Sequence, residues 1–173
     1  MSTTPAPRYD QLPANDGGGL QEDVRDQLRR DHNMALAELE ALRIEKDQRQ
    51  AESRLRALRQ LWMVHALAEE SVVYRALEGL PQAGGGRADE RFIEHELVGG
   101  LFDRLVQARC NSLEWNARIN LLRDLMARHM EAEHDEMFSR LAERFDAQQL
   151  RELGERFASA REKLAMLERA KAA

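Results

Sequence analysis

The sequence predicts an all-α fold: an antiparallel up-down-up-down four-helix bundle with an additional C-terminal fifth helix. Charged residues make up 33% of the 173 residues and aromatic residues only 5%, a composition typical of long helices and poor for a sheet. Apolar residues recur in steps of three or four along five segments, which is the periodicity of one helix face. Four of the five histidines fall on these stripes, where a bundle normally places hydrophobic side chains.

The first two predicted helices follow a tail. Residues 1–19 are rich in proline, glycine and small polar residues, so we expect a flexible tail. The segment 20–46 carries the first stripe: Val24, Leu28, His32, Ala35, Leu39 and Leu42. The segment 50–78 carries the second: Leu55, Leu58, Trp62, His65, Glu69, Val72 and Ala76. Pro81 and the three glycines at 84–86 then break the helical pattern.

Three further helices follow the break. The segment 89–110 carries the stripe Phe92, His95, Gly99, Phe102 and Val106. Asn111 and Glu114 have the spacing of a capping box, and the next stripe is Trp115, Ile119, Leu122, Met126, His129, Glu133 and Met137. Asp146 and Gln149 repeat that spacing before the last stripe: Leu150, Leu153, Phe157, Ala160, Leu164 and Leu167.

The chain divides into three parts on this basis. Residues 20–145 form the four-helix bundle, because four segments of bundle length are joined by short connections. Residues 146–173 form a helix that needs a partner for its apolar side, either the bundle or another subunit. Residues 1–19 remain outside both.

The bulk properties exclude several classes of function. The net charge is −5 with both signs interspersed, which argues against nucleic acid and against a lipid surface as partners. No apolar run approaches the roughly 20 residues of a membrane span. Cys110 is the only cysteine, so neither an internal disulfide nor a thiolate metal cluster is expected. The first residues lack a basic segment followed by an apolar one, and we expect a cytoplasmic location.

Six side chains of metal-ligand type face the predicted core. His65 and Glu69 are four residues apart and therefore share one helix face, and His129 and Glu133 repeat this arrangement. Each of the other two bundle helices carries one histidine in its stripe. A buried carboxylate is costly unless a cation or hydrogen bonds neutralise it. The sequence therefore predicts a two-metal carboxylate site with the ligands His32, His65, Glu69, His95, His129 and Glu133.

The donor set limits the choice of metal. Four imidazoles and two carboxylates without thiolates suit iron, manganese or zinc, and do not suit calcium or magnesium. With both carboxylates bridging, each ion would have fewer than six protein ligands, and the open positions would take water, hydroxide, an oxo bridge or dioxygen. This favours redox-active iron over a closed structural zinc site.

The same residues occur in four segments that resemble the haemerythrin HHE cation-binding family over residues 20–143. These segments are 30–34 (RDHNM), 65–74 (HALAEESVVY), 94–98 (EHELV) and 129–138 (HMEAEHDEMF). The resemblance implies a four-helix bundle with a non-haem, carboxylate-bridged centre of two iron ions. It also implies that His32 and His65 serve one iron, that His95 and His129 serve the other, and that Glu69 and Glu133 bridge them.

Two positions depart from the oxygen-carrying members of this family. Gly99 stands where those proteins have a fifth histidine, and His134 stands where they have a bridging aspartate. The set of four histidines and two glutamates is more similar to bacterial and iron-sensing members, so reversible oxygen carriage is not the first expectation. His134 should lie on the flank of its helix as a surface or outer group, unless a π-bulge turns it inward as a ligand.

For several other residues near the site we expect ordinary structural roles. We expect Glu70, Glu94 and their acidic neighbours off the stripe to be solvated, and Tyr74 to serve packing, with a hydrogen bond near the site or an electron-donor role as alternatives. Gly99 and Gly100 indicate either close helix packing or a gap that gives access to the metals.

Three functions compete on the sequence. The first is a di-iron protein that binds dioxygen, peroxide or nitric oxide for sensing, storage or detoxification. The second is a di-iron oxidase or peroxidase, and the third is a metal-dependent regulatory protein that signals through the C-terminal helix. The expected partners are a small diatomic or peroxide ligand and, through that helix, a homodimer or another protein.

Overall fold

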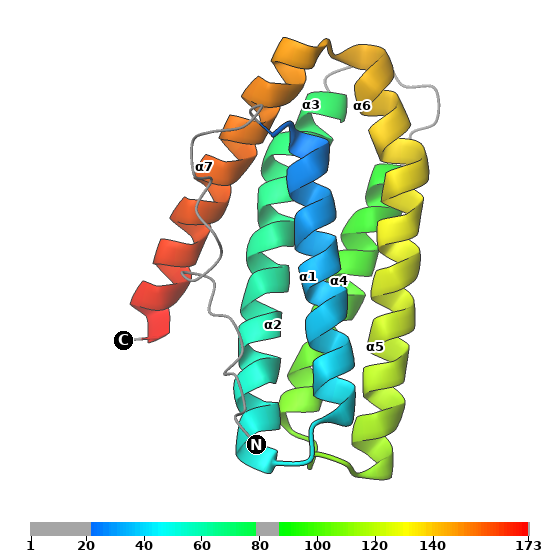
Figure 1. Ribbon diagram of the computed structural model, residues 1–173, viewed down its shortest axis with the longest axis vertical. Coiled ribbons are helices and arrows are strands. Elements are labelled where there is room, and N and C mark those ends of the chain that lie inside the picture. Colours follow the sequence, from blue (N-terminus) through cyan, green and yellow to red (C-terminus); the bar gives the residue numbers. More distant parts are fainter. Residues whose placement is uncertain (1–21, 79–86, 173) are drawn as a thin grey trace.

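The computed structural model describes residues 22–78 and 87–172, and every element within these ranges is helical, consistent with a haemerythrin-type helical bundle. The elements are α1 (Val24–Ile44), α2 (Gln48–Glu69), η2 (Glu70–Tyr74), α3 (Arg75–Glu78), α4 (Arg87–Val106), α5 (Leu113–Ala132), η3 (Glu133–Met137), α6 (Phe138–Arg144) and α7 (Ala147–Ala172). Helices α1, α2, α4 and α5 lie side by side along the long axis (Figure 1). The expected tail at 1–19 and the break at 81–86 lie outside the described residues.

Two of the predicted helices each contain a single π-helical turn. In the second, η2 begins directly after Glu69, and in the fourth, η3 begins at Glu133. A π turn accommodates one extra residue, so the side chains beyond it rotate relative to a regular α-helix. Both turns therefore occur where the two acids of the predicted site enter the core.

Side-chain caps begin several helices. The Asp23 carboxylate accepts hydrogen bonds from the backbone N–H groups of Arg25 and Asp26 at the start of α1. Asp146 and Gln149 form the predicted capping box, with reciprocal bonds of 2.9 and 3.0 Å. The predicted cap at Asn111 is wrong: Ser112 caps α5 by accepting from the Trp115 N–H. Asn111 has a φ of 60°, and its amide donates to the Glu45 carbonyl.

The buried face of α4 is shifted from the predicted one. Phe92 is 37% exposed and Val106 is also exposed. The residues that face the core are Arg91, His95, Val98, Phe102 and Leu105. Arg91 extends toward the ion-pair partner Glu136, 3.6 Å away, which allows a charged side chain to take the place expected for Phe92. The stripes of α1 and α5 are buried as predicted.

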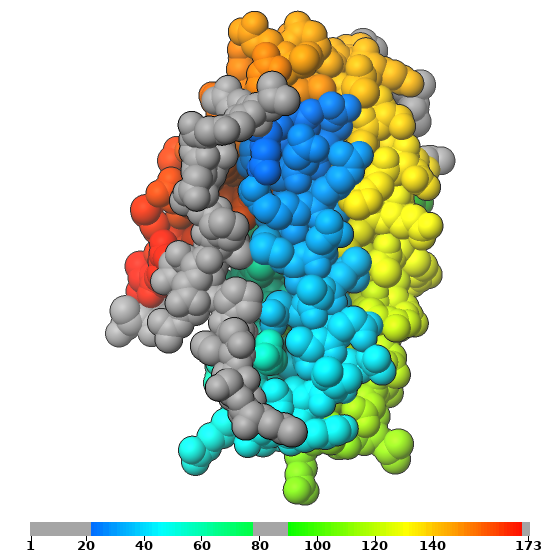
Figure 2. Space-filling view, in the orientation of Figure 1, coloured from blue at the N-terminus to red at the C-terminus, as the bar shows by residue number. Residues whose placement is uncertain are grey.

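Helix α7 packs against α1 and α2 (Figure 1). Leu150, Leu153 and Phe157 are buried there, whereas the predicted Leu167 is exposed. A Cβ atom at Gly154 would lie 3.0 Å from the Glu22 carbonyl oxygen, so a glycine allows α7 to approach the start of α1 closely. Figure 2 shows α1 and α5 in contact along the opposite side of α1.

The buried apolar residues form two clusters separated by the histidine-rich layer. One cluster includes Ala35 and Trp62, and the other includes Leu28 and Val72, so that His32 and His65 lie between the two. Apolar side chains therefore pack on both sides of this layer. None of the helices in the described ranges is long and apolar enough to cross a bilayer.

Candidate metal centre

The structure brings all six predicted ligand side chains into one buried cluster. The Nε2 atoms of His32 and His65 are 3.2 Å apart, and those of His95 and His129 are 3.0 Å apart. Neither Glu69 nor Glu133 has any solvent exposure, and the four histidines are also buried. The cluster therefore consists of two imidazole pairs with two carboxylates among them.

Each carboxylate lies between the two pairs. The two oxygens of Glu133 divide: Oε2 is 3.3 Å from His32 Nε2 and Oε1 is 3.2 Å from His129 Nε2. Glu69 Oε2 is 3.8 Å from His65 Nε2 and 3.5 Å from His95 Nε2. Glu133 thus lies within reach of both imidazole pairs, and Glu69 lies nearest to the pair of His95 and His129.

The donor set fits metal ions. Within the described residues, both oxygens of Glu69 and Oε2 of Glu133 are buried and accept no hydrogen bond. Buried carboxylate oxygens without partners are strongly destabilising, and a cation is the usual compensation. The side chains form two potential cation sites, one of Glu69, His95, His129 and Glu133, and one of His32, His65 and Glu133.

Each ligand-type imidazole has a second polar group behind it. The Nδ1 atoms of His65, His95 and His129 lie 3.3, 2.7 and 2.7 Å from the carboxylates of Asp31, Glu70 and Glu94, respectively. An imidazole that donates from Nδ1 to a carboxylate presents the lone pair of Nε2 to the cluster, as a metal ligand requires. All three acids lie beside a ligand in the sequence.

The expectation that Glu70 and Glu94 are solvated holds only in part, because each is half-buried and contacts an imidazole of the cluster. The π turn η2 directs Glu70 toward α4, and Glu94 reaches across from α4 to α5. Asp31 was not predicted at all. Its position next to His32 gave no signal for this role, because Asp31 accepts from His65 on another helix, whereas the outer nitrogen of His32 meets His134.

His134 lies behind His32 and outside the ligand cluster. Its Nε2 is 3.0 Å from His32 Nδ1, and the two rings stack with centroids 5.1 Å apart. The π turn η3 does rotate this side chain inward, as the alternative reading allowed, but far enough only to contact the outer nitrogen of His32. His134 thus contacts the Nδ1 atom of His32, whereas carboxylates contact the Nδ1 atoms of the other three histidines in the cluster.

Two aromatic side chains complete the site. The Tyr74 hydroxyl donates a 2.8 Å hydrogen bond to Glu133 Oε1, so the interpretation of Tyr74 as packing alone is wrong. The Trp62 ring lies 5.4 to 5.7 Å from the rings of His65, His95 and His129. Tyr74 and Trp62 therefore restrict the positions of one acid and three imidazoles.

Burial and mutual contact shift the pKa values of the side chains in the cluster. Burial and the neighbouring Glu133 raise the pKa of Glu69 well above its ordinary value. Burial opposes ionisation of Glu133 as well, but His129 holds the pKa of that carboxyl below its usual range. Burial would lower the pKa of His129, but the ion pair with Glu133 raises it to about 10. A metal ion that binds in the cluster would displace protons from these side chains.

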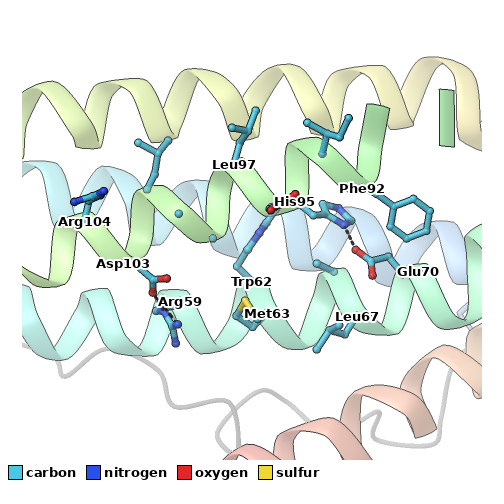
Figure 3. A pocket seen from close by; sticks show the side chains of 16 residues that line it. Arg59, Trp62, Met63, Leu67, Glu70, Phe92, His95, Leu97, Asp103 and Arg104 are labelled. Atoms are coloured by element: carbon cyan, nitrogen blue, oxygen red, sulfur yellow. Dashed lines mark hydrogen bonds and ion pairs between the residues drawn. The ribbon is translucent and has the colours of Figure 1, made fainter. Parts of the chain in front are cut away.

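A surface groove reaches one side of the centre. It has a volume of about 1010 Å³, lies between α2 and α4, and extends inward to His95 and Trp62. Figure 3 shows Glu70 on the α2 side and His95 on the α4 side joined across it, with Phe92 nearby. A Cβ atom on Gly99 or Gly100 would meet nothing within 4 Å, so the interpretation of these glycines as close packing is wrong and the groove is open here.

Comparison with known families agrees with this geometry. Residues 23–141 match the family model described as Hemerythrin HHE cation binding domain, which covers more than half of the chain and all six clustered side chains. No curated protein and no solved structure gave a significant match. A cation-binding domain also agrees with the buried carboxylate oxygens that accept no hydrogen bond. The chain therefore belongs to the haemerythrin HHE cation-binding family.

Proposed function

We propose that the chain is a non-haem di-iron protein that binds dioxygen, peroxide or nitric oxide for sensing, storage or detoxification. In this proposal the cluster lies in an antiparallel up-down-up-down four-helix bundle. His32 and His65 hold one iron, His95 and His129 hold the other, and Glu69 and Glu133 bridge them. Manganese or zinc would fit the same donors. The observation that carries the proposal is the position of both buried carboxylates between the two imidazole pairs.

When bound, iron supplies redox chemistry and open positions for a small ligand; the protein supplies access and surroundings. The groove between α2 and α4 is lined largely by apolar side chains and by the two glycines, which favours small neutral molecules. The Tyr74 hydroxyl is a hydrogen-bond donor fixed on the Glu133 carboxylate. It holds this carboxylate in the orientation that places one oxygen toward each imidazole pair.

The bridging assignment can be tested by Glu133→Gln. We expect iron content to fall well below the wild-type value, because a neutral amide cannot compensate two cations. Glu131→Gln is the matched control: this exposed residue is two positions earlier on α5 and should leave iron content unchanged. Unchanged iron in the Glu133 variant would refute the bridging role.

Ligand binding and catalysis can be separated with the reduced protein. An adduct that persists after one equivalent of dioxygen or nitric oxide supports a binding protein. Repeated consumption of peroxide, followed by stopped-flow absorption, supports the second candidate, a di-iron oxidase or peroxidase. The open groove and the Tyr74 hydroxyl beside Glu133 are the features that favour this candidate.

A regulatory protein that signals through the C-terminal helix is the third candidate. The contacts of α7 with α1 and α2 favour it, because a partner or a second copy of the chain that displaces α7 would uncover the side of the cluster nearest to His65. Metal-dependent change in oligomeric state, measured by light scattering on the full chain with and without iron, would distinguish this candidate from the first two.

A further inference from the structure

A short chain of contacts connects helix α7 to the metal centre. Arg161, on α7, is buried, and its Nη1 atom lies 3.0 Å from Asp31 Oδ1 on α1. The other oxygen of Asp31, Oδ2, lies 3.3 Å from His65 Nδ1 on α2. Three helices thus meet through one guanidinium, one carboxylate and one imidazole.

A second contact also connects α7 to His65. The Phe157 ring, one turn earlier on α7, meets the His65 ring edge-on with centroids 6.0 Å apart. The Arg161 guanidinium lies over that phenyl ring, 5.5 Å from its centre. Two side chains of α7 therefore constrain His65: Phe157 packs on its ring, and Arg161 contacts it through Asp31.

Asp31 is more deeply buried than Glu70 and Glu94, the other two acids that contact the imidazoles. It therefore depends more strongly on a neighbouring cation, which is Arg161. Asp31 is only 2% exposed, whereas the side chains of Glu70 and Glu94 are 24% and 35% exposed. Water can therefore solvate Glu70 and Glu94, but it does not reach Asp31. A carboxylate buried to this degree needs a nearby cation to stay in place.

We infer that Arg161 is a positioning residue that fixes the Asp31 carboxylate and, through it, the His65 imidazole, so that docking of α7 controls metal affinity at the His32–His65 position. The inference rests on the proposed two-metal function. Linkage makes the effect reciprocal: metal at this position must stabilise the docked α7 by the same free energy. The C-terminal helix is then part of the metal centre, although it lies beyond the matched family region.

Anaerobic titration of the metal-free full chain with ferrous iron tests this. For Arg161→Met we expect one of two equivalents to bind about 10-fold more weakly, the lower end of the loss seen when outer partners of metal ligands are removed. The other equivalent should be unchanged. Arg161→Lys keeps the charge and should lose less. Arg156→Met, an exposed arginine of the same helix, is the matched control and should bind as the wild type does.

The titration outcomes are distinguishable. Equal weakening of both equivalents, or none, in Arg161→Met would overturn the positioning role while leaving the di-iron proposal intact. A wild-type chain that binds no iron would overturn both. A purely structural role for Arg161 would lower the melting temperature of the metal-free chain without separating the two equivalents.

Hydrogen exchange provides a second test that needs no variant. Iron loading of the wild-type chain should slow amide exchange along residues 150–165 of α7, and removal of iron with a chelator should restore it. Exchange in α7 that is the same with and without iron, while α2 becomes protected, would overturn the inference.

Discussion

The two imidazole pairs have the same inner geometry but different surroundings. His65 lies against Phe157 of α7 and is backed by the buried Asp31, and His32 is backed by His134. We call this the sealed half. His95 and His129 are backed by two partly exposed glutamates, and a groove reaches His95. We call this the open half. Under the proposed function, this difference predicts a division of tasks: the sealed half anchors metal and links it to α7, and the open half meets small ligands.

The largest difference between the halves should appear in packing. Phe157→Ala removes a fully buried ring above His65 and should cost about 3–5 kcal/mol of unfolding free energy. Phe92→Ala, at the rim of the open half, removes a ring that is already 37% exposed and should cost about 1 kcal/mol or less. Chemical denaturation of both metal-free variants measures this. Equal costs would show that α7 does not seal its side.

The outer acids should differ in the next largest effect. Asp31→Asn should weaken iron binding about 10- to 100-fold at one position, because a neutral amide lacks the negative charge that pairs with the buried Arg161 and is a weaker acceptor for His65 Nδ1 than a carboxylate. Glu94→Gln should weaken binding less, since water can reach His129 Nδ1 once the carboxylate is lost. Iron titrations of the two variants measure both affinities. A larger loss in the Glu94 variant would reverse the comparison.

The halves should also respond oppositely to pH when metal is absent. The pKa of His129 is raised to about 10, so its contribution to stability is complete below about 6.5, its unfolded value, and is lost as pH rises toward 10. Burial and the neighbouring His65 lower the pKa of His32, so stability is also lost as pH falls below 6.5. Melting temperatures of the metal-free chain should therefore peak near neutral pH.

Metal should remove most of this pH dependence. Iron takes the place of the proton on the cluster, so between pH 6.5 and 10 the loaded chain should show a much flatter melting curve than the metal-free chain. Parallel scans of both forms provide the check. Identical pH profiles for the two forms would mean that iron does not bind at His129 and Glu133.

The smallest effect should come from narrowing the groove. Gly99→Leu adds a Cβ that meets nothing within 4 Å and a side chain that should narrow the groove, so it should slow the reaction of reduced iron with peroxide several-fold. It should also raise helix stability by up to about 1 kcal/mol. Gly99→Ala gives the helix effect with little narrowing and is the control. An unchanged rate with full iron content would mean that ligands reach the metals by another path.

The inner cluster could be predicted from the sequence because its signals are local. Histidine at a stripe position and glutamate four residues later share a helix face in any regular helix, and four such stripes can converge only in the core. The same reasoning failed for Phe92 on α4, where the buried Arg91 replaces it beside the site. When a helix carries apolar residues on two adjacent faces, as α4 does, the sequence pattern alone does not show which face is buried.

The outer partners could not be predicted because they depend on non-local geometry. His134 and Glu70 reach the imidazoles through π turns, and a π turn rotates residues that a regular helix would place on the flank. Arg161 contacts Asp31 only because α7 folds back on α1 and α2, which the heptad spacing of α7 does not specify. The sequence thus predicts the ligands more readily than the groups that hold them.

The most direct test of the central claim is anomalous X-ray scattering from iron-loaded crystals of the full chain. The account predicts two iron peaks between the six clustered side chains, one beside His32 and His65 and one beside His95 and His129, with Glu69 and Glu133 contacting both. A single peak, or peaks outside this cluster, would contradict it.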